Sequence, residues 1–414
     1  MKNYSLHIPE GVRDYIGEEA ALKDNIQNKI KKIFRTNGYN LVETPSFEYL
    51  DVFAVGEESY QTPNLYHLVS RQGELMALKS DLTRSIARVV GTQKGDQEAV
   101  QRFCYLANCF RYPERYQGKL HEFTQAGVEL IGNDSLEADA EVINVAVKAL
   151  KAVGTTEFTV HIGNSKFLEY TLEDLGLDEE KKQEVIATLA KKDAVTLKKI
   201  LRESDMDSDT LDMLLELIEC TGNIELVRNL RNKIPSLRVK LLISDMEKLY
   251  NMLEDYGVDE HITFDFNLFA YGKYYTGTMF QIFADNVGAA IAEGGRYDNL
   301  LANFGKDLPA VGFGIHVNLL MQRLIKQRNL TQRQSKKTLV VCSPVTRRVC
   351  SEVSDELRNS DLVLENFLGE DINEAVKYAK AAGLGGILHF KHGDKVDVYN
   401  LENGTVKETS ISQL

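Results

Sequence analysis

The stretch Phe-Thr-Gln-Ala-Gly-Val-Glu-Leu-Ile at residues 123–131 carries a glutamine and a glutamate within a largely apolar run. A second apolar run, residues 103–110, precedes it across the polar segment 111–122, and this order predicts two strands joined by a loop. Residues four apart on a strand point to the same face, so Gln125 and Glu129 can converge on one ligand. The alternative interpretation of these two side chains is a solvated polar stripe.

Regular elements are predicted on both sides of this pair of strands. Apolar residues at helical spacing predict a helix over residues 20–37, with Gly38 as its C-terminal cap. A short strand follows and ends at Pro45, because proline cannot donate to a central ladder. The same patterns predict further helices at 81–90, 135–153 and 311–325, and further strands at 158–162, 262–269, 274–284 and 288–292.

Composition divides the chain into a large core, a linker and a small unit. Residues 1–325 form the predicted core, within which the charged, aromatic-poor segment 175–239 repeats leucines at helical spacing and predicts an inserted helical subdomain. The polar segment 326–337 is typical of a linker. Residues 338–414 alternate strand and helix patterns, which predicts a small α/β domain.

The overall composition is that of an ordinary globular protein. The 414 residues, 43% of them hydrophobic, are enough to bury a large core. No apolar run reaches the roughly 18 residues of a membrane span, and the N-terminus lacks an apolar signal core, so a cytoplasmic location is expected. The net charge of −12 argues against long-range attraction to phosphate polymers. Five cysteines without C-x-x-C spacing, and an isolated pair of His389 and His392, predict neither disulfides nor a metal site.

Asp81 and Thr83 form a second group of candidate binding residues, in the segment Lys-Ser-Asp-Leu-Thr-Arg at 79–84. A carboxylate beside a hydroxyl, each able to accept a hydrogen bond from an ammonium group, suits recognition of an amino acid. The alternative role of Asp81 is to cap the N-terminus of the helix predicted at 81–90.

Two segments combine tyrosines with glycines. Residues 268–278 read Leu-Phe-Ala-Tyr-Gly-Lys-Tyr-Tyr-Thr-Gly-Thr, and residues 293–298 read Glu-Gly-Gly-Arg-Tyr-Asp. Tyr275 and Tyr297 are candidates to contact an aromatic ligand, through ring stacking and their hydroxyl groups. The alternative is that both are ordinary core aromatics on strands.

Residues 8–325 resemble the core of a class II aminoacyl-tRNA synthetase, the histidyl type in particular. The resemblance is carried by the two tyrosine segments and by the segments 9–15 (Pro-X-Gly-X-Arg-Asp), 79–89 and 110–129, and Pro45 stands where motif 1 places its dimer-interface proline. It implies an α+β fold, in which an antiparallel sheet is flanked by helices. A helical insertion and a shortened anticodon-binding-like C-terminal domain would complete this fold.

The resemblance further implies a histidine-binding site. The carboxylate of the ligand would contact an arginine, its ammonium group would contact the acidic, hydroxyl and amide side chains of the site, and its imidazole ring would lie near two tyrosines. The residues that match are Asp81, Thr83, Arg111, Gln125, Glu129, Tyr275 and Tyr297.

The chain departs from the synthetase pattern where a synthetase binds ATP. Ala270 stands at one arginine position, and Lys119 and His121 stand at two others in the motif 2 loop. Residues 312–319 follow the family's Gly-Phe-X-X-Gly-X-Glu-Arg, but end in Asn-Leu. Lysine or neutral imidazole does not replace the bidentate fork of arginine, and lost cationic groups weaken transition-state stabilisation, so adenylation is not expected. The remaining departures are Lys273 at an Asp position, and Asn318 and Leu319 at the motif 3 Glu and Arg.

This combination resembles the family of ATP phosphoribosyltransferase regulatory subunits, which are synthetase-like paralogues. The resemblance implies a non-catalytic subunit without cofactor or metal that dimerises through its core and joins a short-form catalytic subunit in a hetero-octamer. It would activate that subunit in the first step of histidine biosynthesis and transmit feedback inhibition by histidine. No tRNA or membrane partner is expected. Two alternatives remain: a divergent histidyl-tRNA synthetase, or a synthetase-like amino-acid-binding adaptor with another partner.

Overall fold

The computed structural model forms two compact units, Met1–Asn329 and Leu330–Leu414, which are described separately. It describes residues 4–55, 64–93, 99–112, 120–174, 177–190, 196–197, 199–200, 221–234, 236–268, 275–328, 337–360 and 362–414. The predicted boundaries of core, linker and C-terminal domain lie close to this division, although helix α11 (Val317–Arg328) includes the first residues of the predicted linker.

A nine-stranded sheet forms the centre of the first unit, in the order β1-β5-β6-β12-β11-β10-β7-β9-β8. The six strands from β5 to β7 in this order are antiparallel neighbours. The prediction of an antiparallel α+β sheet is therefore confirmed. The strands are β1 (Asn40–Leu41), β5 (Gln101–Phe110), β6 (Glu122–Ile131), β7 (Phe158–Asn164), β8 (Thr221–Gly222), β9 (Ile262–Asp265), β10 (Thr278–Ala284), β11 (Ala292–Arg296) and β12 (Ala310–His316).

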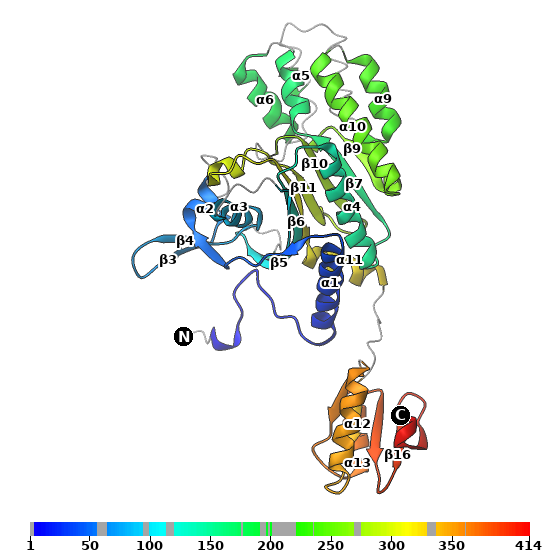
Figure 1. Ribbon diagram of the computed structural model, residues 1–414. Coiled ribbons are helices and arrows are strands. Elements are labelled where there is room, and N and C mark those ends of the chain that lie inside the picture. Colours follow the sequence, from blue (N-terminus) through cyan, green and yellow to red (C-terminus); the bar gives the residue numbers. More distant parts are fainter. Residues whose placement is uncertain are drawn as a thin grey trace. The chain divides into compact units, whose positions relative to one another are not determined.

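Long helices cover one face of this sheet, which we call the helix face (Figure 1). The stripe Ile26, Ile30 and Phe34 of α1 is buried in the largest hydrophobic cluster together with apolar residues of the other helices. As predicted, α1 ends next to Gly38, whose φ of +88° suits a glycine after a helix. These helices are α1 (Gly17–Thr36), α4 (Leu136–Ala152), α10 (Leu237–Asp255) and α11 (Val317–Arg328).

The opposite face, which we call the pocket face, carries helix α3 (Thr83–Thr92) and the short 3₁₀ helix η5 (Leu301–Phe304). Their apolar residues form a separate cluster with Tyr105 of the sheet and with Tyr297, which directly follows β11. Figure 1 shows α3 on the side of β5 and β6 away from α1 and α4. A three-stranded sheet in the order β2-β4-β3 adjoins helix α2; these elements are β2 (Phe47–Tyr49), α2 (Leu50–Ala54), β3 (His67–Val69) and β4 (Leu75–Leu78).

Two predicted elements near the pocket are wrong. The strand predicted at 288–292 is instead β11, which includes Gly294 and Gly295. Adjacent glycines are typical of turns, but here packing requires one, because a Cβ on Gly294 would lie 2.5 Å from the carbonyl oxygen of Gly312. The helix predicted at 311–325 is β12 followed by α11, since periodicity alone does not separate a buried strand from a buried helix.

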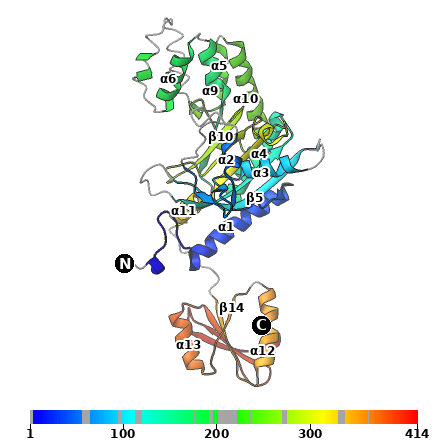
Figure 2. The same ribbon diagram turned by 90° about the vertical axis from the view of Figure 1, so that its left-hand side faces the viewer.

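The region of the predicted helical insertion contains helices in its described part, and Figure 2 shows α5, α6, α9 and α10 gathered together. The leucine repeat at 211–218 lies outside the described residues. Helices α6 (Glu179–Ala190) and α9 (Ile224–Lys233) lie within the predicted range, and α5 (Lys166–Asp174) precedes it. The remaining short 3₁₀ helices are η1 (Tyr4–Leu6), η3 (Asp259–His261) and η6 (Ile411–Gln413).

The C-terminal unit is a five-stranded sheet in the order β14-β13-β15-β16-β17. Helix α12 packs through Cys350 on one side of β13 and α13 packs through Ala375 and Ala379 on the other. The elements are β13 (Thr338–Val341), α12 (Arg347–Asn359), β14 (Leu364–Asn366), α13 (Ile372–Ala381), β15 (Gly386–Phe390), β16 (Lys395–Asn400) and β17 (Thr405–Ser410). Among all described residues, no helix is long and apolar enough to cross a membrane.

Candidate functional site

One pocket of about 200 Å³ opens on the pocket face of the large sheet, and all seven predicted binding residues line it. They come from segments far apart in the sequence: the start of α3, the end of β5, the middle of β6, and the residues around β10 and β11. The seven side chains therefore lie together at one pocket. The predicted residues in the lining are Asp81, Thr83, Arg111, Gln125, Glu129, Tyr275 and Tyr297.

Glycines of β12 make room for the two polar side chains of β6. Gly312 is the register partner of Glu129, and a Cβ there would lie 1.8 Å from Oε2 of that glutamate. A Cβ on Gly314 would lie 2.2 Å from Nε2 of Gln125. The two side chains thus lie over a glycine strip, on the same face of β6, and Gln125 and Glu129 converge on the pocket as their spacing predicted.

Glu129 is a buried carboxyl surrounded by hydroxyl groups. Thr83 Oγ1 donates to its Oε1 at 2.8 Å, and the hydroxyl of Tyr297 donates to Oε2. Burial raises its pKa to about 8, although hydrogen bonds from Tyr297 and Thr83 favour the charged form; nearby Asp81 raises the pKa further. A buried carboxylate is costly without a cationic partner, so this position suits a ligand that brings an ammonium or N–H group.

Asp81 and Arg111 form the polar side of the pocket near the start of α3. The carboxylate of Asp81 accepts from Ser80 Oγ at 3.2 Å and from the backbone N–H of Arg84 at 3.4 Å. The second contact is long for a helix cap, so capping is at most a weak part of its role. Arg111 Nε donates to the Ser80 carbonyl at 2.8 Å, which aims the guanidinium from β5 toward the pocket.

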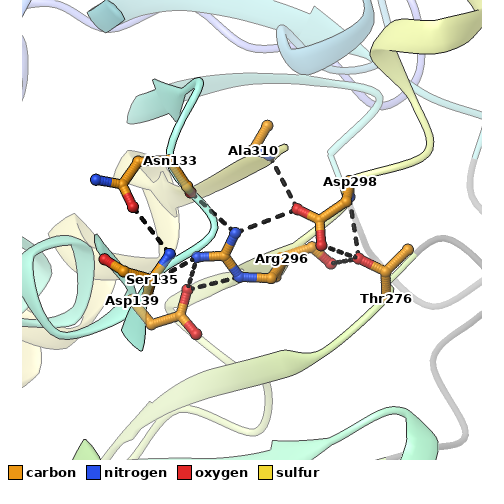
Figure 3. Close-up of polar contacts among 7 residues, drawn as sticks. All are labelled: Asn133, Ser135, Asp139, Thr276, Arg296, Asp298 and Ala310. Carbon is orange, nitrogen blue, oxygen red and sulfur yellow. Dashed lines mark hydrogen bonds and ion pairs between the residues drawn. The ribbon is translucent and has the colours of Figure 1, made fainter. Parts of the chain in front are cut away.

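Arg296 and Tyr297 are adjacent in sequence but contact opposite faces of the sheet. Tyr297 reaches Glu129 on the pocket face, whereas the buried Arg296 ties β11 to the start of α4 (Figure 3). Its Nε and Nη2 lie 3.0 and 2.5 Å from Oδ1 of Asp139, and its Nη1 lies 3.2 Å from Oδ1 of Asp298. It also donates to the carbonyls of Asn133 and Ser135. Within the Gly-Gly-Arg-Tyr-Asp segment, the tyrosine therefore contacts Glu129 in the pocket, whereas the arginine stabilises the packing of β11 against α4.

The residues at the motif 3 and motif 2 departures have structural contacts. Asn318 is buried, and its Oδ1 accepts from the backbone N–H of Thr124 at 2.7 Å. Leu319 packs against the main hydrophobic cluster. His121 turns toward the N-terminal segment, where a Cβ on Gly11 would lie 2.1 Å from its ring. The three other departures, Lys119, Ala270 and Lys273, lie outside the described residues.

Several residues that line the pocket were missed by the sequence analysis. Gln281 on β10 and Glu293 on β11 are register partners, and Gln281 Nε2 donates to Glu293 Oε1 at 3.2 Å. Both line the pocket, as do Tyr105 and Met279. Strand alternation would have placed Glu293 on the face of Tyr297 had β11 been assigned correctly. Among the described residues, no group of three or more His, Cys, Asp and Glu could hold a metal ion.

Comparisons with known proteins agree with this fold. The family model described as Histidyl-tRNA synthetase matches residues 11–320. The chain superimposes on a histidyl-tRNA synthetase from Nostoc sp. PCC 7120 with a TM-score of 0.83 at 21% identity, covering 99% of this chain and 97% of that one. A structure from Bacillus halodurans, described as an ATP phosphoribosyltransferase regulatory subunit/histidyl-tRNA synthetase, gives a TM-score of 0.79 at 30% identity, covering 91% and 97%. The fold and the matching family model define a histidyl-tRNA synthetase-like protein of class II.

Curated relatives specify the family further. Proteins from Ruminiclostridium cellulolyticum and Acetivibrio thermocellus are 33% and 34% identical over 415 aligned residues, covering 100% of this chain and 99% of each relative. Both carry the name ATP phosphoribosyltransferase regulatory subunit. The chain belongs to the family of ATP phosphoribosyltransferase regulatory subunits. The prediction of a regulatory rather than a catalytic subunit is confirmed.

Proposed function

We propose that the chain activates a short-form ATP phosphoribosyltransferase catalytic subunit in the first step of histidine biosynthesis, and that histidine bound in the pocket transmits feedback inhibition. The single observation that carries the histidine site is Glu129, a buried carboxyl whose hydrogen-bond partners in the pocket are hydroxyl groups. Coupling between the pocket and the partner would be a linkage free energy of about 1–3 kcal/mol.

The proposed ligand lies with its charged groups on the polar walls of the pocket. Its carboxylate contacts the guanidinium of Arg111, and its ammonium group contacts Asp81, Thr83 and Gln125, with Glu129 at the buried end. The imidazole ring lies beside the two tyrosines, Tyr275 and Tyr297. This arrangement gives each charged group of an amino acid an opposite or hydrogen-bonding partner.

A dimer through the synthetase-like core is supported by exposed apolar residues around Pro45. Isolated exposed apolar residues are common, but several together on neighbouring strands are typical of an interface. The side chains that support this surface are Leu41, Phe47, Tyr49, Leu68, Val69 and Leu75. In sedimentation, replacing Phe47 and Leu75 by Asp should convert a dimer into a monomer; an unchanged mass would exclude this surface.

Reconstitution tests the regulatory function directly. A purified short-form catalytic subunit is assayed alone, with the chain, and with the chain plus histidine. We expect the chain to raise the rate and histidine to lower it only when the chain is present. An unchanged rate on adding the chain would refute activation, and equal inhibition without the chain would refute its role in feedback. Mass measurement of the mixture tests the proposed hetero-octamer.

Two further assays address the remaining functions. Histidine-dependent exchange of pyrophosphate into ATP should be absent, because Leu319 and Asn318 make apolar and structural contacts instead of holding phosphate. Measurable exchange would favour a divergent synthetase. Capture from a cell extract should recover a short-form phosphoribosyltransferase and no tRNA, whereas a different partner would favour an adaptor role.

A further inference from the structure

Two stacked rings lie beside Arg111, outside the residues that line the pocket. The rings of Phe123 on β6 and His316 at the end of β12 have centroids 4.4 Å apart and planes 14° apart. Phe123 lies on the same face of β6 as Gln125 and Glu129, because the three residues differ by even numbers. His316 is the register partner of Gln125 on the neighbouring strand. The stack therefore forms a wall next to the polar part of the pocket.

Arg111 rests on this wall. Its guanidinium carbon lies 5.4 Å from the centroid of the Phe123 ring, within the range of a cation–π contact. On another side, its Nε donates to the carbonyl oxygen of Ser80. Among the described residues, one carbonyl and one aromatic ring contact this guanidinium group, so its position depends in part on what packs against the ring of Phe123.

The imidazole of His316 is suited to pack against the ring of Phe123 because it carries no charge there. Burial and the nearby charge of Arg111 lower the pKa of its imidazole to about 4, so the ring is neutral at physiological pH and adds no positive charge beside the guanidinium.

We propose that His316 is a positioning residue, which holds Phe123 in place and, through Phe123, orients Arg111 toward the carboxylate of the ligand. This proposal rests on the proposed histidine site and adds a residue to it. Its consequence is selective: the stack supports binding of the carboxylate and leaves the ammonium and imidazole contacts unchanged.

The ring and the helix-capping role of His316 are separable. Its Nδ1 accepts from the backbone N–H of Leu319 at 3.4 Å, at the start of α11. His316→Phe keeps an aromatic ring and removes this acceptor, whereas His316→Asn keeps an acceptor and removes the ring. The probes are histidine and histidinol, which has the same ammonium and imidazole groups but no carboxylate. Their dissociation constants are measured by calorimetry with the full chain.

We expect His316→Asn to weaken histidine binding by about tenfold, the scale of a lost cation–π contact, and to leave histidinol binding unchanged. His316→Phe should bind histidine like the wild type. A matched control is His261→Asn, because His261 stacks on Phe158 with centroids 4.2 Å apart and planes 10° apart, and neither residue is among those that line the pocket. This control should change neither affinity.

An equal loss for histidine and histidinol in His316→Asn would overturn the positioning role, as would unchanged histidine binding in that variant. A loss in His316→Phe as large as in His316→Asn would assign the effect to the helix cap instead. Failure of the wild-type chain to bind either ligand would contradict the proposed histidine site itself, which is a different outcome from these.

Discussion

Two buried carboxyl groups lie on opposite faces of the same sheet and differ in what surrounds them. Asp139 on the helix face contacts the guanidinium of Arg296, which also meets Asp298 and two carbonyls (Figure 3). Glu129 on the pocket face accepts hydrogen bonds from Thr83 and Tyr297. The first carboxyl has a cation supplied by the chain, which is what a stable fold requires. In the described part of the chain, the second carboxyl accepts from donors without full charge, so we assign its cationic partner to a ligand.

The largest effect on stability is expected from breaking the ion pair between Arg296 and Asp139 on the helix face. Replacing Arg296 by Met keeps much of the side-chain volume but leaves Asp139 buried without its cation, and should lower the free energy of unfolding by about 3–5 kcal/mol. Chemical denaturation measures this loss. The double variant Arg296→Met with Asp139→Asn should recover part of it. A single variant as stable as the wild type would show that this ion pair does not hold β11 to α4.

The matched change on the pocket face should affect binding rather than stability. Glu129→Gln keeps the shape of the side chain but removes its charge, and should weaken histidine binding by about 1.5–3 kcal/mol, the range for a hydrogen bond to a charged group. Equilibrium dialysis measures the affinity, and denaturation near neutral pH should show no loss of stability. A strongly destabilised variant with unchanged affinity would mean that Glu129, like Asp139, stabilises the fold and does not bind the ligand.

The pH dependence of stability sharpens the same contrast. The pKa of Glu129 is about 8 in the folded chain, above its ordinary value of 4.5. Its contribution to stability is therefore fully present below pH 4.5 and is lost as the pH rises toward 8. Relative to Glu129→Gln, the wild type without ligand should lose up to about 1.4 kcal/mol per pH unit across this window. Parallel unfolding curves for the two proteins between pH 5 and 8 would contradict the raised pKa.

The smallest expected effect concerns a single hydroxyl donor. Thr83→Val removes the hydrogen bond to Glu129 and should weaken histidine binding by about 0.5–1.5 kcal/mol. Thr124→Val is the matched control, because Thr124 donates to Asn108 at 2.9 Å and does not line the pocket. Calorimetry should show a change for the first variant only. Equal changes in both would mean that the hydroxyl acts through the fold.

Local spacing predicted much of the site because the binding residues lie on regular elements. The alternation of β6 placed Gln125 and Glu129 on one face, and the segment around the start of α3 supplied Asp81 and Thr83, all of which line the pocket. However, the spacing of residues within one segment does not tell how far that segment lies from another in the folded chain. The hydrogen bond from Tyr297 to Glu129 joins residues 168 positions apart, and the resemblance alone brought these segments together.

The errors arose where packing overrides local preference. Gly294 and Gly295 were left outside the strand predicted at 288–292, yet they lie within β11, where neighbouring atoms leave no space for a side chain. The misplaced strand concealed Glu293, and the helix predicted across β12 concealed the glycine strip beneath Glu129. The sequence motif did not distinguish Arg296 from the neighbouring Tyr297. The structure does, because Arg296 makes its contacts on the helix face and Tyr297 makes its contacts on the pocket face.

If histidine supplies the positive partner of Glu129, binding of histidine should release a proton from this side chain. The chain is titrated with histidine at pH 7 in two buffers of different ionisation heat. Because Glu129 has a pKa of about 8 without ligand, a bound cation should ionise it, so we predict saturable heat with release of a proton that Glu129→Gln does not show. No saturable heat at millimolar histidine, or equal proton release from Glu129→Gln, would show that histidine is not the cationic partner of Glu129.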